Sequence, residues 1–188
     1  MIDLARWDLA ALREEWLRAT PFPHLVLDDV LDVAPLREAV ACEPHWPSHG
    51  ELFEMMASSD ALTQPALARF AETLPIEAVA AISGVELRRI EARSYVYLPG
   101  SYLLPHTDFG DSRRVAWVLY LAVDCDGGDL RLYDCDVDGD VVTAARFARD
   151  IAPRPGRLVL FEVSPRSLHE VTEVTRGARV SLAGWFKA

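Results

Sequence analysis

The sequence has few cysteines, no long hydrophobic run and fewer basic than acidic residues. Three cysteines without a C-x-x-C pair argue against a disulfide framework and a cysteine zinc site. No stretch is apolar for long enough to span a bilayer. The first residues, 1–4, lack a basic stretch followed by an apolar run. We therefore expect a cytoplasmic protein without a membrane partner.

The charge balance bears on the partners of the protein. Lysine and arginine together number 19, against 29 aspartates and glutamates, which gives a net charge of −10. An acidic surface repels phosphate backbones, so we expect no nucleic-acid partner. Hydrophobic residues make up 51% and charged residues 26% of the 188 residues, as in globular proteins. That length favours a single domain over residues 1–188.

The first part of the chain, residues 1–84, reads as a helical flank with a first strand. Residue 43 to residue 60 has no regular pattern. Helical spacing and proline positions predict helices, the last one broken at Pro75, and an apolar run predicts one strand. The helices are expected over 9–17, 35–42 and 65–82, and the strand over 22–31.

The second part, residues 85–188, has the texture of a β-domain. Short runs rich in valine, leucine and tyrosine alternate with glycine and proline turns, which is typical of a sandwich or barrel. The expected strands cover 86–98, 102–108, 114–123, 129–133, 141–147, 157–162, 167–175 and 178–186. The fold class is therefore mainly β with flanking helices (α+β), a helical flank packed on a double-sheet barrel.

Three side chains could share a metal ion. His106 and Asp108 stand two apart in LLPHTD (103–108), and residues two apart in a strand point to the same face. His169 lies far along the chain. Two imidazoles and one carboxylate form the facial triad that binds non-haem Fe(II). A His-x-Asp triplet also arises by chance, so a metal-free role for these residues stays open.

An arginine inside an apolar strand is the second chemical feature. Arg179 follows His169 by ten residues, and burying a guanidinium is costly unless an anion meets it. Its planar fork suits a carboxylate, and Ser181 on the same face can add a hydroxyl donor. The dicarboxylate 2-oxoglutarate would chelate iron at one end and pair with Arg179 at the other. The alternatives are an edge-strand arginine that reaches solvent and a solvent-facing serine.

Tyr97 precedes His106 by nine residues. The turn Leu98-Pro99-Gly100 could bring its strand back over the metal, so that the Tyr97 hydroxyl joins Arg179 on the carboxylate. A barrel tyrosine with a solvated tip is an equal alternative. Other aromatic residues are assigned to the core, and a further group could line a substrate mouth. The core set is Trp117, Phe161, Trp185 and Phe186; the mouth set is Tyr102, Phe109 and Arg113.

Several segments together resemble a known family. They are PFPHLVLDDVL (21–31), FEMMASSDAL (53–62), YLPGSYLLPHTD (97–108), RRVAWVLYLA (113–122), GGDLRLYD (127–134), PGRLVLFEVSPRSLHEVTEV (155–174) and RVSLAGWF (179–186). The chain resembles the iron- and 2-oxoglutarate-dependent oxygenases of the prolyl-hydroxylase type. Within them it is most similar to the group of ribosomal-protein prolyl hydroxylases and their bacterial single-domain relatives. The eukaryotic ribosomal enzymes carry a second, degenerate barrel domain that this sequence is too short to include.

The resemblance implies a fold, a site and a reaction. The fold is a double-stranded β-helix, the cupin-like jelly roll, with Fe(II) on His106, Asp108 and His169. Arg179 and Tyr97 would bind the distal carboxylate of 2-oxoglutarate, and ascorbate is an optional reductant. The reaction with O2 would hydroxylate an unactivated C–H bond, with a prolyl residue of a protein or peptide as the leading substrate, and release succinate and CO2. The segment 53–56 would lie near that substrate.

Other functions remain open from the sequence. The substrate could instead be a free amino acid or a small biosynthetic intermediate. A non-catalytic jelly-roll binding module needs no metal, and a zinc hydrolase would have no use for Arg179. The acidic run that starts at Asp134 resembles an EF-hand loop, but its twelfth position is Ala145, where calcium requires a bidentate glutamate. An acidic hairpin turn is the expectation there.

Overall fold

A computed structural model of the chain describes residues 2, 6–59 and 61–188. The expectation that residues 1–4 carry no targeting signal falls largely outside this part, as does residue 60 of the segment 53–62. None of the helices in the described residues is long and apolar enough to cross a membrane.

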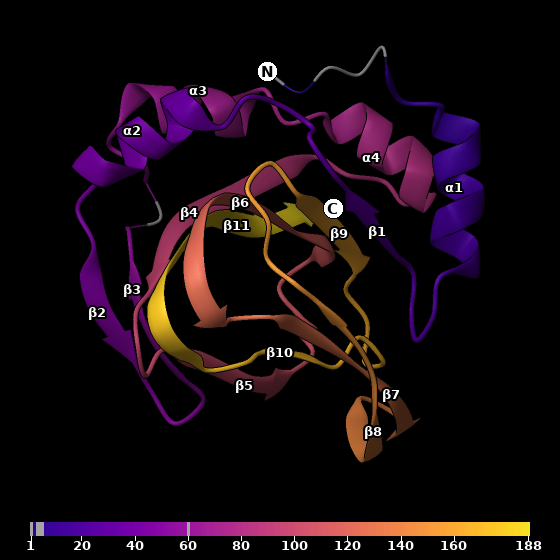
Figure 1. The fold of residues 1–188 in the computed structure, drawn as a ribbon. Coiled ribbons are helices and arrows are strands. Elements are labelled where there is room, and N and C mark those ends of the chain that lie inside the picture. The colour runs from indigo at the N-terminus through magenta and orange to yellow at the C-terminus, as the bar shows by residue number, and fades with distance from the viewer. Residues whose placement is uncertain (1, 3–5, 60) are drawn as a thin grey trace.

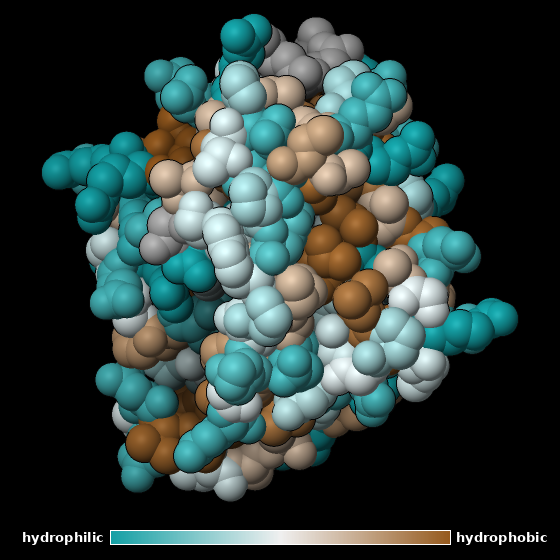
Figure 2. Space-filling model, turned by 90° about the vertical axis from the view of Figure 1, so that its left-hand side faces the viewer, coloured by the Kyte–Doolittle hydropathy of each residue, from teal (hydrophilic) through white to brown (hydrophobic). Residues whose placement is uncertain are grey.

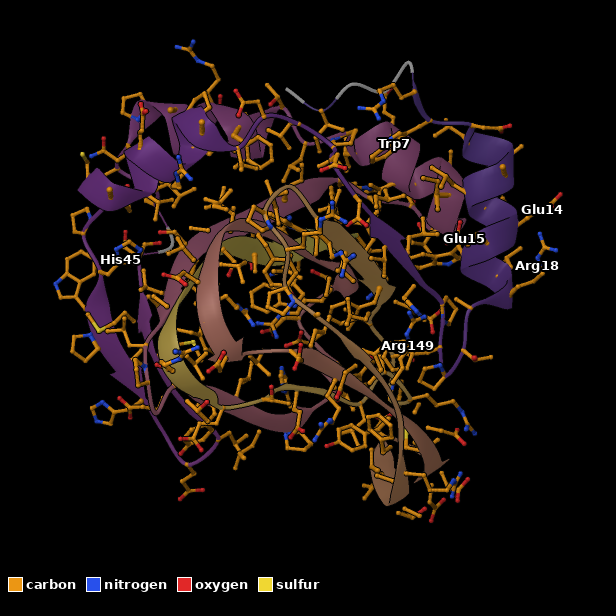
Figure 3. The ribbon with its side chains drawn as sticks, viewed as in Figure 1. Trp7, Glu14, Glu15, Arg18, His45 and Arg149 are labelled. Carbon is orange, nitrogen blue, oxygen red and sulfur yellow. The ribbon has the colours of Figure 1, made fainter. Side chains whose placement is uncertain are left out.

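The helices lie together along one side of a rolled sheet, at the top and right of Figure 1. The Asp8 carboxylate accepts hydrogen bonds from two backbone N–H groups of the first helix, and Gly84, with φ +78°, ends the last one. Glu14 and Arg18 pair at 2.8 Å on the outward side of the first helix (Figure 3). The helices are α1 (Leu9–Arg18), α2 (Ala34–Cys42), α3 (Pro65–Glu72) and α4 (Ile76–Ser83).

The strands form one antiparallel sheet that rolls into two facing layers (Figure 1). Its order is β1-β9-β6-β11-β4-β3-β5-β10-β7-β8, with β2 paired to β3. This arrangement confirms the mainly β fold with flanking helices. The strands are β1 (His24–Leu27), β2 (Trp46–His49), β3 (Phe53–Ala57), β4 (Arg89–Tyr97), β5 (Tyr102–His106), β6 (Arg113–Gly127), β7 (Leu130–Asp138), β8 (Val141–Ile151), β9 (Leu158–Glu162), β10 (His169–Val171) and β11 (Val174–Lys187).

Both faces of the central strand β6 are buried. Trp117, Leu119 and Leu121 face the helices, whereas Val118 and Tyr120 face the interior between the two layers of strands. Neighbouring strands follow the same alternation, because successive residues of a strand point to opposite faces. The sheet therefore has an outer core under the helices and an inner space in which a site can form.

Several local expectations were wrong. The segment 43–60 is not irregular: β2 and β3 form a hairpin, and Pro47 fits because β2 is an edge strand. The strand expected over 22–31 is only β1, since Asp29 takes φ +53° and turns the chain. Gly177 lies inside β11 and not in a turn. Glycine is required there because a side chain would collide with the Asp124 carbonyl oxygen on β6.

The acidic run after Asp134 lies in the β7–β8 hairpin, as expected. Arg146 on β8 pairs with Asp134 at 3.2 Å and with Asp136 at 3.0 Å across the hairpin. Those two carboxylates already have a cationic partner. The hairpin itself projects from the body of the molecule, at the lower right of Figure 1.

Candidate active site

Three side chains of types that can hold a metal ion converge in the interior of the barrel. One ligand atom from each of His106, Asp108 and His169 lies within 4.8 Å of the others. His106 and His169 are direct cross-strand partners on β5 and β10, and their ring centroids are 4.3 Å apart. Antiparallel pairing of β5 and β10 thus brings together two histidines that are 63 residues apart in the sequence.

Asp108 reaches the two histidines by a route that differs from the expected one. The sequence argument placed His106 and Asp108 on one face of the same strand, but β5 ends at His106. Asp108 lies beyond the strand with φ +58°, a left-handed conformation that is uncommon outside glycine. This turn directs the carboxylate back, with Oδ1 3.5 Å from His106 Nε2 and Oδ2 3.6 Å from His169 Nε2.

Backbone carbonyl groups orient both imidazoles. His106 Nδ1 lies 2.9 Å from the Leu104 carbonyl oxygen, and His169 Nδ1 lies 2.8 Å from that of Ser167. A carbonyl oxygen can only accept, so each Nδ1 carries the proton and donates. In the neutral form of each ring, Nε2 then carries the lone pair, and it faces Asp108. Fixing the tautomer in this way is typical of histidines that bind a metal.

The electrostatics of the group follow from burial and from mutual contact. Burial, and then the charge of His106, lower the pKa of His169 to about 4. Burial opposes ionisation of Asp108, but hydrogen bonding to His106 and the nearby histidine charges outweigh it and lower its pKa. Burial also opposes charging of His106, but Asp108 raises its pKa overall. A neutral His169 and an ionised Asp108 are the forms that bind a cation.

Two residues hold the Asp108 carboxylate from behind. Trp185 Nε1 donates to Asp108 Oδ2 at 3.0 Å, and Arg113 Nη1 lies 3.6 Å from Oδ1. The Arg113 guanidinium stacks on the Trp185 ring at 3.9 Å. Trp185 is partly buried and packs against the inner core, as expected, and its indole N–H also contacts the candidate metal ligand Asp108. Trp185 follows Arg179 by six residues, and residues separated by an even number in a strand point to the same face. The sequence therefore already places the two side chains on one face of the strand.

Arg179 is buried in the same cavity. It lies on β11 between β4 and β6, which excludes the edge-strand alternative. Only 3% of it is exposed. Its guanidinium lies 4.3 Å from the Tyr97 ring centroid and 5.0 Å from that of Tyr120, and Nη1 donates to the Gly128 carbonyl oxygen at 2.7 Å. The cation thus has aromatic and carbonyl contacts but no carboxylate partner among the described residues.

Three buried polar atoms at this cation have no hydrogen-bond partner among the residues that the structure describes. They are Arg179 Nε, Ser181 Oγ and Tyr120 OH. Ser181 is fully buried, which excludes a solvent-facing hydroxyl, and it pairs directly with Tyr120 across β11 and β6. Leaving a buried polar group unpaired costs about 1–3 kcal/mol. An oxygen-rich anion in the cavity would give all three atoms a hydrogen-bond partner.

Tyr97 is placed beside Arg179, as expected. It is the direct partner of Arg179 on β4, is buried, and presents its ring face to the guanidinium. Burial raises the pKa of Tyr97, so the phenol stays neutral. The sequence argument missed Tyr120. Its local sequence is apolar on both sides, and both faces of β6 are buried, so alternation did not show which face the cavity lies on.

One cavity of about 370 Å³ joins the two clusters. Its lining includes the metal-binding residues, Arg179 and Ser181, and also Leu52, Phe53 and Met55 from the β2–β3 hairpin. The expected mouth residue Arg113 lines it too, whereas Phe109 is exposed beside Asp108. The side of the molecule that carries β2 and β3 faces the viewer in Figure 2, where hydrophobic patches are interspersed with hydrophilic residues.

Comparison with known proteins identifies the family. The model of the 2OG-Fe(II) oxygenase superfamily matches residues 92–187, just over half of the chain. The chain belongs to the 2OG-Fe(II) oxygenase superfamily. Fe(II) and 2-oxoglutarate are the cofactor and co-substrate that this family implies, and the donor set of this oxygenase fits both. Its histidines and carboxylate suit the metal, and the arginine Nε, serine Oγ and tyrosine OH that have no partner among the described residues suit the dicarboxylate.

Relatives of this oxygenase act on proline according to their names. It is 31% identical over 192 residues to prolyl 3-hydroxylase OGFOD1 of Xenopus laevis, with 90% of this chain and 36% of that protein covered. Its fold is similar to that of a Pseudomonas putida prolyl-4-hydroxylase, with a TM-score of 0.72, 24% identity, and 95% and 98% of the two chains covered. A Trichoplax adhaerens prolyl hydroxylase bound to a hypoxia-inducible-factor peptide gives 0.68, with 14% identity and 97% and 93% covered. The chain spans little more than a third of the length of the Xenopus protein.

Proposed function

We propose that this oxygenase is an Fe(II)- and 2-oxoglutarate-dependent dioxygenase that hydroxylates a prolyl residue in a protein or peptide. One observation carries the proposal: a cavity that combines a two-histidine, one-carboxylate cluster with a buried arginine that has no carboxylate partner among the described residues. A zinc hydrolase or a metal-free binding module would have no use for both.

The residues of the chain would divide the work between the two clusters. His106, Asp108 and His169 would hold Fe(II), which when bound supplies the oxidising chemistry with O2 and 2-oxoglutarate. Arg179 would pair with the distal carboxylate of 2-oxoglutarate, a partner that suits its planar fork. The Ser181 hydroxyl would donate a hydrogen bond to that carboxylate.

Tyr97 and Tyr120 would keep the arginine in place and the carboxylate dry. Their rings flank the guanidinium, and both are buried. The Tyr120 hydroxyl, which has no partner in the described structure, would donate to the same carboxylate. A water-excluding wall strengthens the ion pair, because the local dielectric is low.

The substrate assignment is supported by the names of the relatives and by the cavity mouth. Leu52 lines the cavity, and its carbonyl oxygen accepts from the Leu104 N–H at 2.7 Å. Both leucine side chains are exposed, and so is Phe109, which follows Asp108 in the sequence. An apolar mouth of this kind suits a peptide, because it can contact the residues on either side of the proline.

We also propose that residues 1–188 act as one domain in the cytoplasm, in keeping with three free cysteines.

The test is product analysis with a matched pair of variants. Incubation with Fe(II), 2-oxoglutarate, O2 and proline-containing peptides should release succinate and add one oxygen atom to the peptide. Tandem mass spectrometry against 3- and 4-hydroxyproline standards gives the position. Asp108→Ala should abolish both products, and Asp136→Ala, on the exposed hairpin, should not. Hydroxylation of free proline but of no peptide would overturn the substrate assignment, and full turnover by Asp108→Ala would overturn the site.

A further inference from the structure

The turn between β6 and β7 lies directly behind Arg179. It contains Gly127 and Gly128, both with positive φ, at +80° and +75°. The Gly128 carbonyl oxygen accepts the hydrogen bond from Arg179 Nη1 at 2.7 Å. The guanidinium is therefore held by contacts with two tyrosine rings and by the hydrogen bond to this turn.

The two glycines differ in what a side chain would meet. A Cβ on Gly127 would collide with the backbone carbonyl oxygen of Glu173, so that glycine is required by the backbone itself. A Cβ on Gly128 would instead lie 3.3 Å from Arg179 Cδ and 3.0 Å from Val174 Cγ2. Both neighbours are side-chain atoms, so they would have to shift by a few tenths of an ångström, and one of them is the stem of the anion-binding arginine.

We propose that Gly128 is a positioning residue for the co-substrate. Its carbonyl group anchors the guanidinium, and its lack of a side chain gives the Arg179 stem the space it occupies. This inference rests on the proposed function, in which Arg179 binds the distal carboxylate. Gly128 touches neither the metal-binding residues nor the substrate mouth, so its effect should be confined to 2-oxoglutarate.

The test is the affinity for 2-oxoglutarate without turnover. Isothermal titration calorimetry of 2-oxoglutarate into the anaerobic Fe(II)-loaded protein gives the dissociation constant. Gly128→Ala should raise that constant about tenfold, because the displaced guanidinium loses the planar, bidentate geometry of its pair with the carboxylate. Fe(II) affinity should stay unchanged, and the KM for 2-oxoglutarate should rise more than kcat falls. A merely structural role would not produce that split.

Gly139→Ala is the matched control. Gly139, in the β7–β8 turn, has φ +58°, and nothing lies within 4 Å of a Cβ placed on it. Gly139→Ala therefore introduces the same backbone strain as Gly128→Ala, an alanine at positive φ, but no contact with the arginine. Gly128→Asn is a second variant, because asparagine tolerates positive φ better and so keeps the turn folded.

The outcomes separate this inference from the function on which it rests. No heat of 2-oxoglutarate binding to the wild type would overturn the proposed function and the inference with it. Binding by the wild type, together with a dissociation constant within twofold of it in a folded Gly128 variant, would overturn the inference alone. So would an equal rise in Gly139→Ala.

Discussion

Replacing Arg179 with methionine should affect binding and stability very differently. Methionine has a similar length but no charge, so it fills the space between the two tyrosine rings. The guanidinium is buried and has no carboxylate partner in the described structure without co-substrate. Its contribution to the unliganded protein is therefore small, while its contribution to the liganded protein is large.

The magnitudes follow from the contacts. The variant loses a charged hydrogen bond to the Gly128 carbonyl group, about 1.5–3 kcal/mol, and two cation–π contacts of about 0.5–1 kcal/mol each. It gains the desolvation free energy of one buried ion, several kcal/mol. The free energy of unfolding should thus change by about 2 kcal/mol or less. Loss of the buried pair with 2-oxoglutarate should cost about 2–5 kcal/mol, a rise in the dissociation constant of roughly 30-fold to 5,000-fold.

The assay pairs two measurements on one sample. Chemical denaturation gives the free energy of unfolding, and calorimetry gives the affinity for 2-oxoglutarate. Arg176→Met is the control, because Arg176 is on the same strand but exposed, in a pair with Asp126 at 2.9 Å. It should change neither quantity appreciably. Unchanged 2-oxoglutarate affinity in Arg179→Met, or a loss of stability that exceeds the loss of binding, would refute the reasoning.

Two further predictions concern the metal-binding group and the pH dependence. Trp185→Phe removes the donor to Asp108 Oδ2 and should weaken Fe(II) affinity about 10–100-fold in a metal titration, with the fold intact by circular dichroism; unchanged affinity would show that the indole does not position the carboxylate. Burial lowers the pKa of His24 below 6.5, and its Nε2 accepts a hydrogen bond from Arg149, which links β1 to β8. The unfolded chain binds that proton more readily, so stability present above pH 6.5 is lost as the pH falls toward the folded pKa, by up to about 1.4 kcal/mol per unit. His24→Gln should flatten this decline in denaturation curves, and an unaltered slope would contradict the assignment.

Much of the architecture could be predicted from the sequence. Helices α1 and α2 and the break at Pro75 follow from local spacing and proline positions, and most strands of the second part were found within a few residues. The β2–β3 hairpin could not be found, since Pro47 and Gly50 look like loop residues. Only pairing with a neighbouring strand stabilises that hairpin. Gly177 was placed in a turn because the sequence does not show its close approach to β6, which is a tertiary contact.

The sequence predicted those site residues whose charge does not suit the apolar residues around them. Arg179 was conspicuous because a guanidinium in an apolar strand needs an anion, and the structure buries it without a carboxylate partner in the described residues. Asp108 was named for the wrong reason, because a left-handed residue after β5, and not strand alternation, directs it. Tyr120 and Trp185 look like core residues in sequence. Their roles depend on which face of a doubly buried strand meets the cavity.

The most direct test of the account is the visible charge-transfer band that forms when 2-oxoglutarate chelates protein-bound Fe(II). It is recorded anaerobically in the wild type and in His169→Ala. We expect the band in the wild type only when both Fe(II) and 2-oxoglutarate are present, and no band in the variant. A wild-type protein without the band, or a variant with an undiminished one, would contradict the assignment of His106, Asp108 and His169 as the iron ligands.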